Sequence, residues 1–116
     1  MHEISIAICI ADEIMRIARE NNARRILTAS LRIGKGAGVV IDSLRFALDV
    51  VQREYPMLSP TRIEIDEIPL IYKCDNCYEE FETADIYFPR CPICNSYESK
   101  LISGEEMEIK DIEIEV

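Results

Sequence analysis

Two Cys-x-x-Cys pairs, Cys74–Cys77 and Cys91–Cys94, constrain the fold of this chain more than any other feature of its sequence. Each pair can present two thiolates to one cation from a tight turn, and two such turns close a tetrahedral site. Thirteen residues separate the pairs, slightly fewer than in the usual zinc-ribbon spacing. Because four cysteines leave no open coordination position, the spacing predicts a structural zinc (Zn2+) site and not a catalytic one.

Two other chemistries use the same residue types. A rubredoxin-like iron site takes four thiolates, and a redox dithiol takes a single Cys-x-x-Cys pair. A thioredoxin-like dithiol stands at the start of a helix that follows a buried strand, and neither pair is placed in such a pattern. Zinc is therefore the favoured occupant. The fifth cysteine, Cys9, lies in an apolar segment without a catalytic partner, so we interpret it as a packing thiol.

Hydrophobic periodicity on both sides of the cysteine segment is typical of an α+β domain. Residues 4–19 and 39–54 repeat their apolar positions at helical spacing, which predicts two amphipathic helices. Alternation at period two predicts strands at 26–33, 61–68 and 105–116. In the last of these the apolar set changes phase, so we expect a β-bulge or bend near Lys110-Asp111.

The simplest architecture places the two helices on a three-stranded β-sheet. A small zinc-ribbon-like domain, residues 70–103, is then inserted between the second and third strands, and residues 1–69 plus 104–116 form the α/β domain around it. Aromatic and charged residues between Tyr78 and Arg90 are compatible with a short hairpin inside the insert. The glycine-rich turn Gly34–Gly38 matches neither a Walker A motif nor a dinucleotide fingerprint, so we expect a flexible connection there.

The first helix has an apolar arc that exceeds half of its circumference. We expect one stripe to face the core, comprising Ile4, Ala7, Ile8, Ala11, Ile14, Met15 and Ala18. Beside it lies a second stripe, formed by Ile6, Ile10 and Ile17. The helix is therefore either buried on two sides, or it exposes the second stripe as a docking surface for a partner protein.

The charge balance excludes some classes of partner. The chain has 22 acidic and 13 basic residues, for a net charge of -9, and such a surface repels nucleic acid. The cysteine segment has three basic residues (Lys73, Arg90, Lys100) against six acidic ones (Asp75, Glu79, Glu80, Glu82, Asp85, Glu98). No basic leader precedes the first apolar segment, and no uninterrupted apolar run is long enough to span a bilayer. We therefore expect a cytoplasmic protein with no membrane partner.

The only histidine, His2, directly follows Met1. A histidine beside a chain end is usually a solvated side chain, but this position has a specific coordination chemistry. The Met1 amine, the deprotonated His2 backbone nitrogen and the His2 ring Nδ1 close two adjacent chelate rings on one metal. Three nearly coplanar nitrogens suit Ni(II) or Cu(II), and the fourth donor is either the Glu3 backbone nitrogen or its carboxylate. Such an open site is easily dismantled by protonation, which suits metal delivery.

These residues together resemble the HypA/HybF family of hydrogenase maturation proteins, and the resemblance runs over nearly the whole chain. The ordered set that carries it is Met1-His2-Glu3, Ile33-Gly34, Leu44-x-Phe46-Ala47, the run from Ile63 to Pro69, the two cysteine pairs with Pro92, and the run from Ser103 to Ile109. One departure is that Asn76 and Asn95 stand where many family members have a glycine or another turn residue near or after the second cysteine of a pair. Asparagine tolerates left-handed turns, so we expect both turns to survive.

The resemblance implies a nickel metallochaperone that is not itself an enzyme. It implies that His2, with Met1 and Glu3, binds the transported Ni2+, and that the domain formed by residues 1–69 plus 104–116 is the nickel-binding domain. It further implies delivery of nickel to the large subunit of [NiFe]-hydrogenase in partnership with a HypB-type GTPase. Some family members also serve urease, which this sequence does not decide. The alternative is a zinc-ribbon protein-interaction module without a nickel role.

Overall fold

The structure, a computed structural model, describes residues 3–116 and contains two helices and two three-stranded sheets. In chain order the elements are α1 (Glu3–Glu20), β1 (Arg25–Gly34), α2 (Ile41–Gln52), β2 (Arg62–Ile68), β3 (Ile71–Cys74), β4 (Glu80–Glu82), β5 (Ser99–Ser103) and β6 (Met107–Glu115). The sheets have the orders β2-β1-β6 and β4-β3-β5. The expected fold is confirmed: two helices accompany a three-stranded sheet, and an insert precedes the last strand of that sheet.

Contacts between residues divide the chain into two compact units. The first, here called the helical unit, holds the chain up to Leu31 together with Val39–Ile65 and Ile109–Val116. The second, here called the cysteine unit, holds Arg32–Gly38 and Asp66–Glu108. The boundaries near residues 70 and 103 were expected to separate a zinc-binding part from a nickel-binding part. That division of function stays a prediction.

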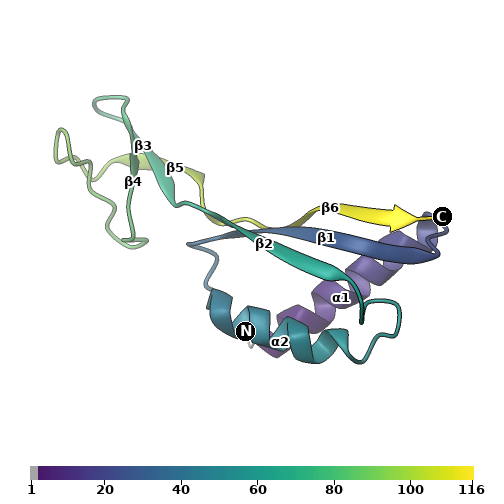
Figure 1. Cartoon of the computed structure of the whole chain (residues 1–116). Coiled ribbons are helices and arrows are strands. Elements are labelled where there is room, and N and C mark those ends of the chain that lie inside the picture. The colour runs from purple at the N-terminus through teal and green to yellow at the C-terminus, as the bar shows by residue number, and fades with distance from the viewer. Residues whose placement is uncertain (1–2) are drawn as a thin grey trace. The chain divides into compact units, whose positions relative to one another are not determined.

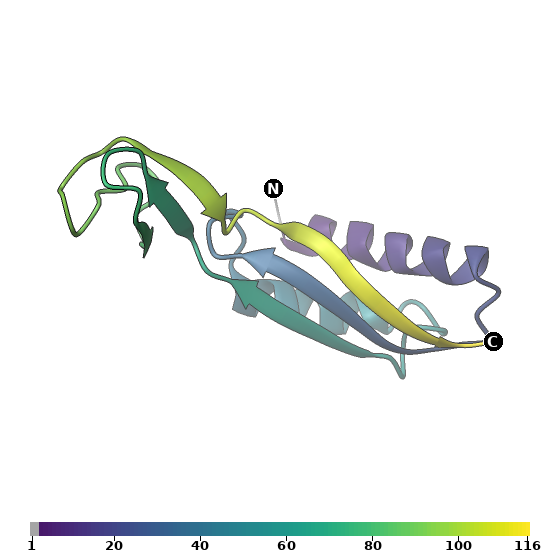
Figure 2. The same ribbon diagram turned by 90° about the horizontal axis from the view of Figure 1, so that it is seen from above.

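In the helical unit both helices lie on one face of the sheet, and β1 and β2 run in the same direction while β6 runs opposite to them (Figures 1 and 2). Parallel neighbours cannot be joined by a tight turn, and α2 supplies the crossover between β1 and β2. In residues 3–116 no helix has both the length and the apolar character needed to cross a membrane.

The buried face of α1 is rotated relative to the face that we expected. Its buried residues are Ile6, Ala7, Ala11, Ile14 and Ala18, whereas Ile4 and Ile8 are each 43% exposed. The expected docking stripe is therefore wrong at Ile6, and the solvent-facing isoleucines belong to the stripe that we assigned to the core. Both sides of this helix are about equally apolar, so periodicity alone could not choose between them. The three alanines on the buried face permit close packing.

The end of α1 agrees with the sequence. Asn22 adopts a left-handed backbone with φ 56°, and the Ala23 N–H reaches the Ala18 carbonyl at 2.9 Å. The Asn21 side chain donates a further hydrogen bond to the Ile17 carbonyl at 2.8 Å. These bonds satisfy carbonyl groups that the last turn of a helix leaves free, and they release the chain toward β1.

In the cysteine unit, the turn that we expected to be a flexible connection is held by backbone hydrogen bonds. The N–H groups of Gly34 and Gly36 donate to the carbonyls of Glu106 and Gly104, both at 2.7 Å, and the Lys35 N–H donates to the Ile68 carbonyl at 2.9 Å. A Cβ atom on Gly34 would lie 2.0 Å from the Gly104 oxygen. Glycine is required here because two backbone segments touch.

Gly104 gives a test of this contact. Its φ is 115°, and an added Cβ would lie 2.6 Å from the Leu70 Cα, so we expect Gly104→Ala to lower the free energy of unfolding by about 2–3 kcal/mol. Gly38→Ala is the matched control, because Gly38 has a φ of 78° but open space around it, and backbone strain alone costs about 1 kcal/mol. Urea denaturation of the metal-loaded chain measures both; equal losses would contradict the close contact.

Candidate metal centre

The cysteines lie on a hairpin and on the loop that follows it. Cys74 ends β3, and the first Cys-x-x-Cys pair forms the turn into β4, which pairs antiparallel with β3 through Tyr72 opposite Phe81. β5 pairs with the other edge of β3. The hairpin expected within 78–90 is therefore wrong: β4 returns to β3, and the residues between β4 and Cys91 contain no strand.

The apolar core around these cysteines is small. It consists of Leu70, Tyr72 and Phe81 with the fully buried Cys74 and Cys91, and the rings of Tyr72 and Phe81 stack with their centroids 6.0 Å apart. Two of the five core side chains are thus metal-ligand types. So little buried apolar surface does not offset the entropy of ordering the loop, so an added cross-link is needed to hold this unit folded.

The four sulfur atoms are arranged to share one ion. They all lie within 4.8 Å of one another, with 3.4 Å between the Sγ atoms of Cys74 and Cys94 and 3.5 Å between those of Cys77 and Cys91. Four thiolates at about 2.3 Å from a tetrahedral ion have sulfur–sulfur separations of about 3.8 Å. A disulfide sulfur pair, in contrast, is about 2.05 Å apart. The arrangement fits a single tetrahedral metal ion better than it fits disulfides.

Backbone N–H groups point toward the first of these sulfurs. The amides of Asn76 and Cys77 each lie 3.4 Å from the Cys74 Sγ. These two amides place partial positive charge against the sulfur atom. The two halves of the cluster are also joined directly, since the Asp75 N–H donates to the Glu98 carbonyl at 2.9 Å.

Both cysteine turns use a left-handed residue directly after the second cysteine. Tyr78 has φ 64° and Asn95 has φ 65°, and their N–H groups bond to the carbonyls of Cys74 and Cys91 at 3.0 and 2.9 Å. The left-handed conformation expected at Asn95 is confirmed, but in the first turn it occurs at Tyr78 and not at Asn76. This conformation costs about 1–2 kcal/mol for a residue with a bulky side chain, and glycine would avoid that cost.

Protonation of the metal-free cluster is unequal among its thiols. Hydrogen bonds from the Asn76 side chain and the Ser96 backbone lower the pKa of Cys94 to about 6. A backbone hydrogen bond at Glu79 acts to lower the pKa of Cys77, but burial and the three neighbouring cysteine side chains outweigh it and raise that pKa to about 12. At neutral pH the Cys94 sulfur is therefore largely a thiolate, whereas Cys77 keeps its proton until a metal displaces it.

Two of the three expected nickel ligands, Met1 and His2, lie outside the described residues. The third, Glu3, is half-buried and is the first residue of α1.

Three residues exposed beside the cysteines, Tyr78, Ile93 and Tyr97, were not expected from the sequence. The signal for them was available, because each is a large apolar residue within three positions of a ligand cysteine.

Comparison with known proteins agrees with this geometry. Residues 1–114 match a family model described as HypA, hydrogenase/urease nickel incorporation, metallochaperone. Hydrogenase maturation factor HypA of Geobacter metallireducens is 34% identical over 115 residues, with 99% of this chain and 100% of that protein covered. HypA of Chlorobium luteolum is 37% identical, with 99% and 97% covered.

Solved structures show the same fold. The solution structure of the nickel metallochaperone HypA from Helicobacter pylori superposes with a TM-score of 0.68 at 20% identity, covering 98% of this chain and 97% of that one. A second solution structure of a HypA protein gives a TM-score of 0.69. With the match of the family model over residues 1–114 and the four-cysteine cluster in place, this chain belongs to the HypA family of nickel metallochaperones for hydrogenase maturation.

Proposed function

We propose that this chain binds Ni(II) at its amino terminus and delivers it to the large subunit of [NiFe]-hydrogenase, with a HypB-type GTPase as its partner. The observation that carries the proposal is the family match, which begins at residue 1 and so includes Met1-His2-Glu3. The chelate chemistry of this tripeptide agrees with the nickel named in the description of the family. We further propose that this work is done in the cytoplasm, where free thiols persist.

The donors for nickel are the Met1 amine, the His2 backbone nitrogen and the His2 ring. For the fourth donor we favour the Glu3 backbone nitrogen over its carboxylate. Glu3 opens α1, and the first N–H groups of a helix have no intrahelical acceptor, so deprotonating this one breaks no helix bond. A helix start also carries about +0.5 charge, which opposes a bare cation but favours a complex whose backbone nitrogens have lost their protons.

For the resident metal we propose zinc, held by Cys74, Cys77, Cys91 and Cys94. Support comes from the four sulfurs within 4.8 Å and from the amide N–H groups that face Cys74. A bound zinc ion supplies no reaction here; it cross-links the β3–β4 hairpin to the loop before β5. The proposed functions divide the chain into two parts: residues 70–103 form the zinc domain, and residues 1–69 with 104–116 form the nickel-binding domain.

The test of the nickel site compares the native, untagged chain with His2→Ala. We expect one zinc in both proteins, and Ni(II) uptake in the native chain only, because the variant loses the ring nitrogen that closes the second chelate ring. A second variant adds one glycine before Met1, which leaves His2 in place but converts the amine donor into an amide. It should lose nickel binding as well. Metal analysis and Ni(II) titration by calorimetry measure these outcomes.

Unchanged circular dichroism spectra control for folding in both variants. If His2→Ala takes up nickel as the native chain does, the amino-terminal site is refuted. If neither protein takes up nickel while both keep zinc, the alternative of a zinc-ribbon interaction module is correct.

The zinc site should weaken as the pH falls. The raised pKa of Cys77, about 12, means that at least one proton leaves at neutral pH when metal binds, so affinity should fall about ten-fold or more for each pH unit of acidification. Below the Cys94 pKa of about 6 a further proton competes, and the loss should steepen by about another ten-fold per unit. Competition with a chelator between pH 5 and 8, corrected for protonation of the chelator, measures this slope. A flat profile from pH 6 to 8 would contradict it.

A further inference from the structure

Large apolar side chains stand exposed beside the metal-ligand cysteines. Tyr78 is 73% exposed and directly follows Cys77, and Ile93, 63% exposed, lies between the cysteines of the second pair. Tyr97 is 60% exposed, and the guanidinium of Arg90 lies over its ring at 5.5 Å. We call Tyr78, Ile93 and Tyr97 the knuckle surface. Each of the three lies within three positions of a ligand cysteine in the chain, and the four cysteine sulfurs lie within 4.8 Å of one another.

The backbone conformation of Tyr78 indicates that its side chain has a function. With φ 64° it occupies a conformation that glycine adopts without strain and that a bulky residue adopts at a cost. Its side chain is mostly exposed and is not part of the buried core, so packing does not explain why tyrosine stands there. Strain kept at an exposed aromatic residue points to a function that needs the ring.

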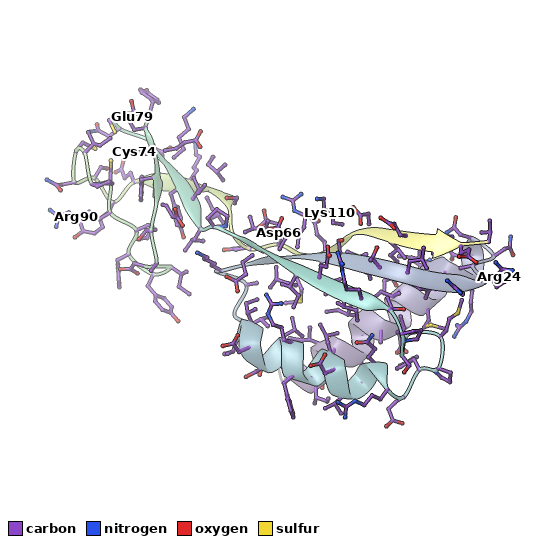
Figure 3. The ribbon with its side chains drawn as sticks, in the orientation of Figure 1. Arg24, Asp66, Cys74, Glu79, Arg90 and Lys110 are labelled. Carbon is purple, nitrogen blue, oxygen red and sulfur yellow. The ribbon has the colours of Figure 1, made fainter. Side chains whose placement is uncertain are left out.

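The loop that leads to the second cysteine pair adds two more exposed rings. Tyr87 and Phe88 are 79% and 73% exposed, and their backbone N–H groups both donate to the Asp85 carboxylate at 2.9 Å. These bonds lower the pKa of Asp85, so its carboxylate stays charged and continues to accept the two hydrogen bonds that hold the turn that carries both rings. Arg90, which follows this turn in the chain, is labelled with Cys74 and Glu79 in Figure 3.

The net charge of the segment that carries the knuckle surface favours one kind of occupant. The six carboxylates between residues 70 and 103 outnumber the three basic side chains. Among the residues that the structure describes, only Asp75 forms an ion pair in this segment, with Lys100 at 3.7 Å. Phosphate backbones, anionic lipids and a second copy of this chain, itself at -9, are all repelled.

We propose that the knuckle surface is a docking site for a cationic, amphipathic segment of a partner protein: a short stretch with leucine-like side chains on one side and lysine or arginine on the other. Tyrosine and phenylalanine bury about 150–250 Å² each, so the two rings of the knuckle surface together with Tyr87 and Phe88 offer on the order of 500 Å². A standard interface takes about 800 Å² from each partner. The available area suits a peptide segment better than a whole domain. The docking site does not depend on nickel, so it stands or falls apart from the amino-terminal site.

The experiment uses the zinc-loaded full chain and a fluorescein-labelled synthetic peptide of 14 residues, with leucine on one helical face and lysine on the other. A second peptide replaces every leucine by serine and keeps the charge. Fluorescence anisotropy should give at least ten-fold tighter binding of the leucine peptide. Tyr78→Gly and Ile93→Ser should each weaken that binding at least about five-fold, as expected for exposed anchors that become buried.

Two controls separate docking from a structural role. Phe46→Ser removes a ring that is 71% exposed on α2 in the helical unit, and it should leave binding within two-fold of the native value. Tyr78→Gly should keep its zinc and raise the midpoint of thermal unfolding, because glycine relieves the left-handed strain. Weaker peptide binding in a more stable protein is a result that a purely structural tyrosine cannot give.

Several results would overturn the proposal. Equal binding of both peptides would show attraction by charge alone, and no binding of the leucine peptide would refute the chemistry assigned to the partner. Equal losses in Phe46→Ser and Tyr78→Gly would remove the site from the knuckle surface. Tighter binding of an oligouridine probe would assign the rings to base stacking, and a dimer that Tyr78→Gly dissociates would assign them to self-association.

Discussion

Four cysteine sulfur atoms within 4.8 Å of one another join the β3–β4 hairpin to the loop that precedes β5. The cysteine unit has few other means of holding this geometry, because its core reduces to Leu70, Tyr72 and Phe81 once the ligand-type cysteines are set aside. A metal–thiolate cross-link is far stronger than the burial of three side chains. The turn conformations at Tyr78 and Asn95 follow from it, because each must bring two sulfurs of one pair to the same point.

Helices and strands whose apolar residues repeat with a clear period were predictable from the sequence. Features set by the packing of neighbouring elements or by backbone hydrogen bonds were not. Both helices and the three strands of the first sheet lie within a few residues of their expected positions, because alternation and helical spacing report burial directly. The rotation of α1 was missed because Ile4 and Ile6 are equally apolar, and only the neighbouring elements decide which is covered. The hydrogen bonds that hold the Gly34–Gly38 turn were not predicted, because main-chain hydrogen bonds leave no side-chain signature in the sequence.

The metal centre was predictable for a different reason. Coordination chemistry fixes residue type and spacing together, so two Cys-x-x-Cys pairs identify a four-sulfur cluster before any fold is known. The strained residue beside it was not predictable with the same certainty. Asparagine at position 76 resembles a left-handed turn residue, yet the backbone places that conformation at Tyr78, where tyrosine is an unexpected choice. The spacing of the cysteines identifies the metal ligands in the sequence. The strained turn residue beside them, Tyr78, is identified only by its φ angle in the structure.

The proposed zinc and nickel sites differ in the properties that would keep the two metals apart. Divalent nickel and zinc have similar affinities for most donor sets, so a protein that handles both must discriminate by donor type and geometry. Four thiolates, of which Cys74 and Cys91 are fully buried, form a closed tetrahedral set that suits a metal that stays. In the proposed nickel site, nitrogens of Met1, His2 and Glu3 would form an open planar set, which protonation of the imidazole would weaken. Under this proposal, zinc from the cysteine site could replace a released nickel ion only if the cysteine unit were dismantled, so delivery of nickel would leave zinc in place.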